Sequence, residues 1–169
     1  MKRHPALIPL SRDHHDGLVQ AVRLRRAAAG GDASARLAAA REFVQFFRNE
    51  ERVHLRGEED ELFPLFLRYV QSQPAPLREA RVHHVQLEGF VRTLEIAAAA
   101  GIADRETLAA AAELLDAHIR LEERQLFPLI EELVPDDELA RLGLASRDAA
   151  CAVRRPPVTS ESKIVQPRE

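Results

Sequence analysis

The residues most suited to chemistry in this sequence are histidines and glutamates that recur in one pattern at two places. The first copy begins at His54 and has the sequence HLRGEEDELFPL, and the second begins at His118 and has the sequence HIRLEERQLFPL. Both follow the pattern H-x-R-x-E-E-x-x-L-F-P-L. Residues four apart on an α-helix lie on nearly the same face. Each copy can therefore direct one imidazole and one carboxylate, Glu58 or Glu122, at the same point.

Two further segments each carry a pair of adjacent histidines. The segment RDHH at 12–15 is followed by apolar residues at 18 and 22, and the segment RVHH at 81–84 is followed by apolar residues at 87 and 91. Six of the seven histidines lie in these four motifs, and only His4 does not. The sequence thus predicts two helical hairpins, each with a histidine pair followed by an H-x-x-x-E motif.

These residue types, placed in register with apolar stripes, indicate a metal site. Leu62 and Leu65 follow the first H-x-x-x-E motif, and Leu114, Leu115 and Leu126 surround the second. A buried carboxylate is costly unless it is paired or bound to a cation. Dimetal sites in helical bundles use inward-facing Glu and His from facing helices. Such mixed ligands suit iron, manganese or zinc.

The two H-x-x-x-E carboxylates come from opposite hairpins and are well placed to bridge two ions. One histidine from each helix plus two glutamates give fewer ligands than two octahedral ions need. The remaining positions are then available to water, hydroxide or a small molecule.

Four helical segments must position these groups. We predict helices over about residues 11–29, 32 or 34 to 71, 77–100 and 105–133. Ser11 and Asp104 are the expected N-caps, and the loops contain Gly30-Gly31, the SQPAP segment at 72–76 and Gly101. Gly57, Pro64 and Pro128 fall inside the helices, where they predict bends or breaks.

Helices of this length joined by short loops pack antiparallel with their neighbours. We therefore predict an all-α fold, an up-down-up-down antiparallel four-helix bundle over residues 1–150, with a short helix restarting at 135–144. Residues 151–169 form a short C-terminal extension, rich in proline, serine and charge, which we expect to be a flexible tail.

Composition narrows the class of protein. The chain has 169 residues, enough for one buried core, and a net charge of −3, so no basic surface predicts nucleic acid as a partner. The apolar N-terminal stretch is too short for a signal peptide, and no run approaches the roughly 20 apolar residues of a membrane span. We expect a cytoplasmic protein with no membrane partner. The single cysteine, Cys151, excludes an internal disulfide and a multi-thiolate metal site.

The four motifs, in this order, resemble the hemerythrin-like family, also called the HHE cation-binding domain. The matching residues span about 7–134: a histidine on the first helix, His54-x-x-x-Glu58, a histidine on the third helix, and His118-x-x-x-Glu122 followed by Leu-Phe-Pro. The resemblance implies a non-haem di-iron centre bridged by the two carboxylates and by an oxo or hydroxo group, with manganese or zinc as alternative metals. The nitrogen ligands that it implies are His15, His54, His84 and His118.

Only one histidine of each adjacent pair can face the centre, because neighbouring residues on a helix lie about 100° apart. The apolar residues at 18, 19 and 22 centre close to His15, and those at 87, 91 and 94 centre between His83 and His84. Members of the family usually carry an apolar residue three positions after the ligand, which favours His15 and His84. His14 and His83 then lie at the rim as alternates or outer hydrogen-bond donors.

Two departures from the oxygen-carrying members bear on function. Those members have His-x-x-x-His on the third helix, whereas Ala80 stands four residues before His84 here. They also have His-x-x-x-x-Asp on the last helix, whereas this chain has His-x-x-x-Glu. The missing nitrogen ligand opens a coordination position or invites a carboxylate, for which Glu88 and Glu79 are candidates. Reversible oxygen carriage is disfavoured, and an oxidisable or peroxide-reactive centre is favoured.

Three functions follow as hypotheses. The first is a protein that binds or senses a small-molecule partner such as oxygen, nitric oxide or peroxide, or that handles iron. The second is a di-iron redox enzyme, namely an oxidase, a peroxidase or an enzyme of nitric oxide. The third is a metal-free helical interaction module. Glu59 and Glu123 are expected at the surface or just outside the ligands, and the sequence leaves the oligomeric state open.

Overall fold

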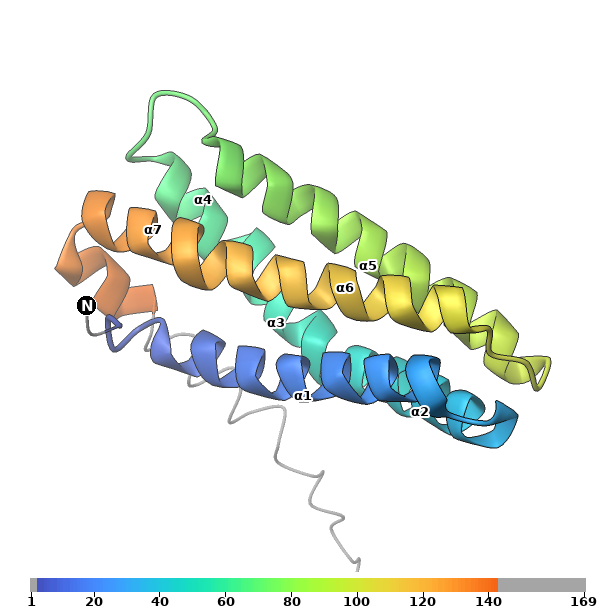
Figure 1. Cartoon of the computed structure of the whole chain (residues 1–169). Helices are drawn as coiled ribbons and strands as arrows, with labels where there is room; N and C mark the ends of the chain where they lie inside the picture. The colour runs from blue at the N-terminus through green and yellow to red at the C-terminus, as the bar shows by residue number, and fades with distance from the viewer. Residues whose placement is uncertain (1–2, 143–169) are drawn as a thin grey trace, which may run out of the picture.

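Four helical rods make up the part of the chain that the computed structural model describes, residues 3–142 (Figure 1). The first rod is α1 (Ile8–Gly30) and the third is α5 (Ala75–Ala99). The second rod runs without interruption through α2 (Ala33–Phe46), η1 (Phe47–Glu51), α3 (Arg52–Gly57), η2 (Glu58–Leu62) and α4 (Phe63–Leu67). The fourth consists of α6 (Arg105–Leu121), η3 (Glu122–Leu126) and α7 (Phe127–Leu133), and residues 136–142 form one more helical segment.

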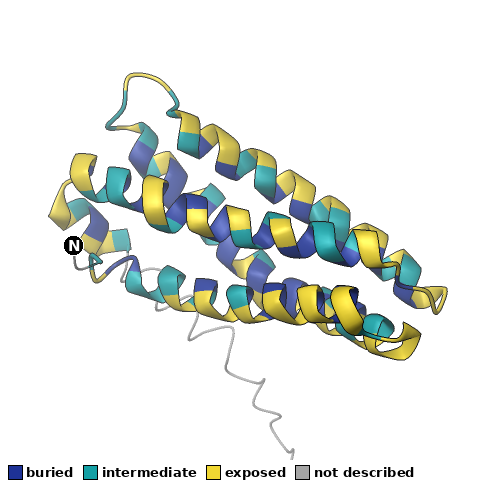
Figure 2. Cartoon of the chain, in the orientation of Figure 1, coloured by how far each residue is buried: buried dark blue, intermediate teal, exposed yellow. Residues whose placement is uncertain are grey.

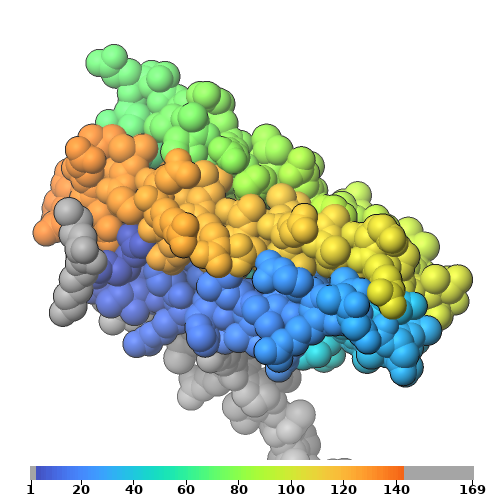
Figure 3. Space-filling view, in the orientation of Figure 1, coloured from blue at the N-terminus to red at the C-terminus, as the bar shows by residue number. Residues whose placement is uncertain are grey.

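The rods form the predicted up-down-up-down antiparallel bundle. The first rod packs against the second and the fourth, through α2 and α6, and α5 packs against the same two on the other side. Residues 3–142 contain no strand. The space-filling view shows the first, fourth and third rods side by side on one face of the bundle (Figure 3). None of the described helices is both long enough and apolar enough to cross a bilayer. The predicted tail at 151–169 and Cys151 lie outside the described residues.

The helix ends follow the expected chemistry with one exception. The Asp32 carboxylate accepts the backbone N–H of Ala35 at 2.8 Å, and Asp104 accepts that of Thr107 at 2.7 Å, so both residues are N-caps. The prediction that Ser11 is the N-cap of the first helix was wrong. The helix begins about one turn earlier, since Pro9 fits in a first turn, where no amide donor is needed.

The bends expected near the two helix prolines take the form of wide π-helical turns. The N–H of Phe63 donates to the carbonyl of Glu58, and the N–H of Phe127 donates to that of Glu122, five residues back in each case. Proline lacks the donor for the normal bond and its ring collides with the carbonyl four residues earlier, and a wider turn relieves that collision. Such turns occur frequently at functional sites. Here each one begins at a glutamate of the repeated motif.

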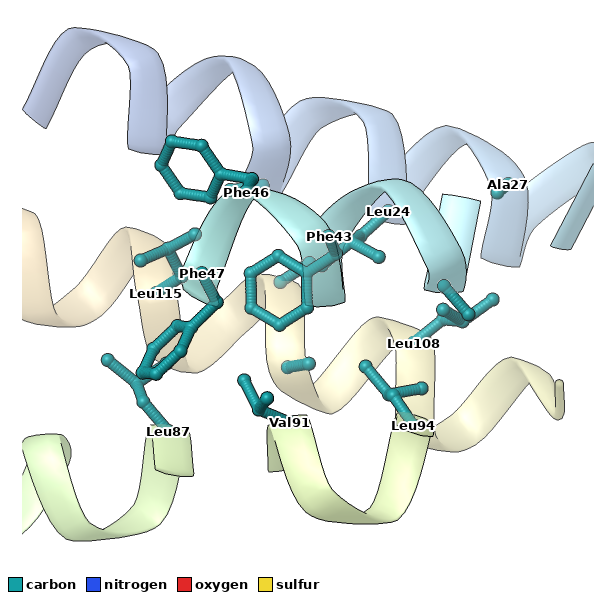
Figure 4. Close-up of a cluster of buried hydrophobic side chains, with 14 of the residues drawn as sticks. Leu24, Ala27, Phe43, Phe46, Phe47, Leu87, Val91, Leu94, Leu108 and Leu115 are labelled. Atoms are coloured by element: carbon teal, nitrogen blue, oxygen red, sulfur yellow. The ribbon is translucent and has the colours of Figure 1, made fainter. Parts of the chain in front are cut away.

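The core consists of two apolar clusters, one toward each end of the bundle, with polar groups buried between them. Figure 2 shows the buried positions along the inward faces of the rods. One cluster surrounds Phe43, Phe47 and Leu94 (Figure 4), and the other contains Phe63 and Phe127. The buried polar or charged residues are His14, Gln20, Glu51, His54, Glu58, His84, His118 and Glu122.

Candidate metal centre

The structure brings histidines and glutamates from all four rods together in the interior. They form two groups, each with four ligand atoms that lie within 4.8 Å of one another. Both groups contain Glu58 and Glu122, which start the π turns of the second and fourth rods. The first group is completed by His14 and His54, and the second by His84 and His118. All six side chains are buried.

Each shared glutamate reaches histidines of two different rods. Glu58 Oε1 lies 3.2 Å from Nε2 of His54 on its own rod, and Glu58 Oε2 lies 3.4 Å from Nε2 of His84. Glu122 Oε2 lies 3.0 Å from Nε2 of His14 and 3.6 Å from Nε2 of His118. Glu58 thus turns one oxygen toward each pair of histidines, whereas Oε2 of Glu122 lies near one histidine of each pair and its Oε1 lies 3.7 Å from Nε2 of His84. Both carboxylates therefore lie between the two pairs, as a bridging carboxylate would.

The facing atoms fit a pair of cations better than they fit one another. Eight ligand atoms of the two groups are buried and make no hydrogen bond of normal geometry with the described residues, although Nε2 of His14 and Oε2 of Glu122 lie only 3.0 Å apart. These atoms are Nε2 of His14, His54, His84 and His118, and both carboxylate oxygens of Glu58 and of Glu122. Buried polar atoms without partners are rare and costly. Two atoms that bind one ion at about 2.1 Å, at right angles, lie about 3 Å apart. The observed spacing is therefore that of ligands around shared ions.

A second layer of carboxylates fixes two of the histidines. Nδ1–H of His14 donates to Glu123 at 2.7 Å, and Arg3 donates to the other oxygen of Glu123 at 2.6 Å. In the same way, His84 donates to Glu59 at 2.9 Å, and Arg81 donates to Glu59 at 3.0 Å. A proton held on Nδ1 leaves Nε2 free to bind a metal. The second glutamate of each repeated E-E pair thus holds a histidine of a neighbouring rod.

The phenylalanines of the repeat complete these supports. Phe127 stacks on the ring of His14 with centroids 5.3 Å apart, and Phe63 stacks on that of His84 at 5.7 Å. Both phenylalanines are fully buried in the apolar cluster near the prolines. The repeated L-F-P sequence therefore serves both packing and the orientation of the rings.

In the absence of metal, two histidines of this cluster, His14 and His84, have raised pKa values. Burial lowers the pKa of His14, but contacts with Glu122 and Glu123 outweigh it and raise the pKa to about 9. Burial also lowers the pKa of His84, but contacts with Glu122 and Glu58 outweigh burial and raise this pKa to about 10. His118 differs, since burial lowers its pKa to about 4. A metal ion that binds here must displace protons from His14 and His84.

The structure corrects the choice within the first histidine pair. His14 is buried in the cluster, whereas the predicted ligand His15 is exposed. The prediction treated Val19 and Val22 as inward-facing, but these residues are 37% and 40% exposed. The inward face of α1 instead carries small residues such as Gly17, which allow α1 to pack closely against α6.

The other alternates lie outside the two groups. His83 is half-buried, and its ring is edge-on to that of His118 with centroids 5.9 Å apart. Glu88 accepts two hydrogen bonds from Arg52, at 3.1 and 3.0 Å, and Glu79 is exposed and lies 4.0 Å from His83. Neither carboxylate replaces the missing nitrogen ligand in this structure, and Ala80 is buried among apolar residues.

The sequence did not predict two carboxylates that lie beside the cluster, those of Glu51 and Asp13. Glu51 is buried, and burial raises its pKa. Asp13 accepts from Nδ1 of His54 at 3.4 Å. The signal for Glu51 was available, because it lies three residues before His54 and residues at that spacing share a helix face. Asp13 lies next to the histidine pair, but sequence spacing alone does not show that it reaches another rod.

A four-helix bundle with two overlapping sets of interior histidines and glutamates has the arrangement of helical proteins that bind metal ions in the bundle core. The family model of the hemerythrin HHE cation-binding domain matches residues 6–130. The chain belongs to this family. No curated protein and no solved structure matched it.

Proposed function

We propose that the protein binds two iron ions at this centre and uses them to bind or sense a small molecule such as oxygen, nitric oxide or peroxide, or to handle iron. The observation that carries the proposal is the pair of four-residue groups that share Glu58 and Glu122. Membership of a cation-binding family supports the same conclusion.

The donor set supports iron. Each group offers two imidazoles and two carboxylates, and no thiolate. Two histidines with a carboxylate and open coordination positions are typical of non-haem iron that reacts with oxygen. Four protein donors leave up to two positions of an octahedral ion for water or another small ligand. Iron bound here would supply those positions, while the chain fixes the donors and screens them from bulk solvent.

The burial of the site supports a small partner. All six ligands are buried, and His118, Glu58 and Glu122 have no exposed surface. Two surface pockets of the described residues lie elsewhere: Arg41 and Glu95 line one, and Arg25 and Arg105 line the other. Neither pocket includes a ligand of the centre, and the burial of the six side chains suits a molecule of a few atoms better than a large substrate.

Metal analysis combined with spectroscopy tests the proposal. The purified protein should contain two iron ions per chain, and its absorption spectrum should change when oxygen, nitric oxide or hydrogen peroxide is added to the reduced form. The variant Glu122→Gln should lose most of this iron, and the exposed control Glu132→Gln should keep it. A protein that takes up no metal, and whose stability is unaffected by His54→Ala or His118→Ala, would instead be a metal-free helical module.

A second candidate is a di-iron redox enzyme. It is favoured by Ala80, which is fully buried among apolar residues and puts a methyl group, not an imidazole, four residues before His84. Multiple turnovers of peroxide or nitric oxide with an electron donor would support the enzyme. A single stoichiometric reaction would support the binding or sensing protein.

A further inference from the structure

The internal repeat makes the two halves of the centre near copies, so the places where they differ are informative. Both halves have two histidines, a stacked phenylalanine and a carboxylate held by an arginine. In this correspondence His14 matches His84, and His54 matches His118. The halves differ in the groups around the second member of each half, His54 and His118.

The first difference concerns the residue beside the ring of His54 in one half and of His118 in the other. In one half, Asp13 accepts from Nδ1 of His54 at 3.4 Å. The residue that corresponds to Asp13, one position before His84, is His83, whose ring lies edge-on to His118. Nδ1 of His118 has no hydrogen-bond partner among residues 3–142. One half therefore has a carboxylate where the other has an imidazole.

The second difference lies three residues before the same histidines. Glu51 is 2% exposed, and its Oε1 has no hydrogen-bond partner in the part of the chain that the structure describes. The corresponding residue of the other half is Leu115, which is fully buried in the apolar cluster with Leu87 and Phe47 (Figure 4). A buried carboxylate without a partner is costly unless a cation lies near it. Glu51 thus points to a positive charge in its own half of the centre.

Gly17 on α1 lies where this helix passes close to Ile119 and Glu51. A Cβ at Gly17 would lie 3.8 Å from Oε2 of Glu51 and only 2.8 Å from the side chain of Ile119. The residue that corresponds to Gly17, three positions after His84, is Leu87, which is fully buried. The backbone of α1 therefore approaches Glu51 closely, whereas a leucine side chain fills the matching place in the other half.

We propose that Asp13 and Glu51 make the two metal positions unequal, so that the position formed by His14 and His54 binds its ion first and more tightly than the position formed by His84 and His118. This inference rests on the proposed function. Opposite charges attract strongly where the surroundings have a low dielectric constant, as they do around the buried Glu51. Asp13 is half exposed and contributes through its hydrogen bond with Nδ1 of His54. Glu51 lies outside both four-residue groups, so it acts on the ion through its charge or through a coordinated water.

Zinc binding to single-position variants tests the inference, since zinc has no redox chemistry. His118→Ala disables one position and His54→Ala the other. We expect the His118→Ala protein to bind one zinc ion at least about tenfold more tightly than the His54→Ala protein, in competition with a chromophoric chelator. Equal affinities of the two variants, or tighter binding by His54→Ala, would overturn the inference.

The change Glu51→Leu supplies a matched second test, because it copies Leu115 of the other half. It should weaken zinc binding about tenfold when combined with His118→Ala, and by less than about twofold when combined with His54→Ala. An equal effect in both combinations overturns the inference. Circular dichroism of each variant checks folding, and Glu51→Gln keeps the side-chain shape if the leucine variant does not fold.

The outcome with the unchanged chain separates the two proposals. Two zinc ions bound with equal affinity would overturn the inequality and leave the dimetal centre intact. No bound zinc and no bound iron would overturn the proposed function and this inference together.

Discussion

Gly17→Ala should destabilise the bundle, although alanine is the better helix former. Gly17 lies inside α1, three residues after His14, where α1 packs against α6. A Cβ there would approach Cδ1 of Ile119 to 2.8 Å. Carbon atoms in contact prefer about 3.5–4.0 Å, so either the buried Ile119 side chain or the backbone of α1 must move.

The expected magnitude combines two opposing effects. Overpacking a closely packed core costs about 1–3 kcal/mol, and replacing glycine by alanine within a helix contributes about 1 kcal/mol of stability. The net result is a loss of about 1 kcal/mol in the free energy of unfolding. Gly89→Ala on α5 is the matched control, because a Cβ there meets no atom within 4 Å. This control should gain about 0.5–1 kcal/mol.

Urea denaturation of the metal-free proteins, followed by far-ultraviolet circular dichroism, measures both changes. The two substitutions are chemically identical and should shift the midpoint in opposite directions. If Gly17→Ala stabilised the protein as much as Gly89→Ala does, then the close packing of α1 against α6 would not be tight enough to select glycine.

Three further predictions concern protonation, the outer carboxylates and the helix ends. In the metal-free protein, the contacts of protonated His14 and His84 stabilise the fold fully below pH 6.5, and this stabilisation is lost as the pH rises through their pKa values of about 9 and about 10. The free energy of unfolding, measured by urea titration, should therefore fall between pH 6.5 and 10, and a rise would contradict these contacts. Glu123→Gln should weaken metal binding about 10- to 100-fold, as measured by chelator competition, and the exposed Glu132→Gln should leave it unchanged. Asp104→Ala should cost about 1 kcal/mol of unfolding free energy without affecting metal binding, because it removes only an N-cap.

The sequence predicted the fold well because its signals were local and redundant. Aspartate caps, loop residues and two copies of one motif independently marked the helices. Pro64 and Pro128 marked the positions of η2 and η3, whereas η1 has no proline that would reveal it. It could not predict where α1 begins, since Ser11 and the turn that contains Pro9 are both acceptable starts, and only packing decides between them.

The sequence identified a candidate ligand where a second candidate ligand followed or preceded it at the spacing of the helix period. His54 with Glu58, and His118 with Glu122, are each fixed by a spacing of four residues. The choice between His14 and His15 failed because small residues such as Gly17 can face a core as well as valine can, and hydrophobicity does not identify them. The arginines that hold Glu123 and Glu59 lie far from them in sequence or on another rod, so no local pattern reveals these contacts.

The sharing of Glu58 and Glu122 has a consequence for which changes the centre can tolerate. Loss of any one histidine removes a donor from a single group and leaves the other group complete. Loss of either glutamate removes a donor from both groups at once. In the proposed centre, loss of a histidine would therefore leave one group able to hold an ion, whereas loss of Glu58 or Glu122 would leave neither group whole.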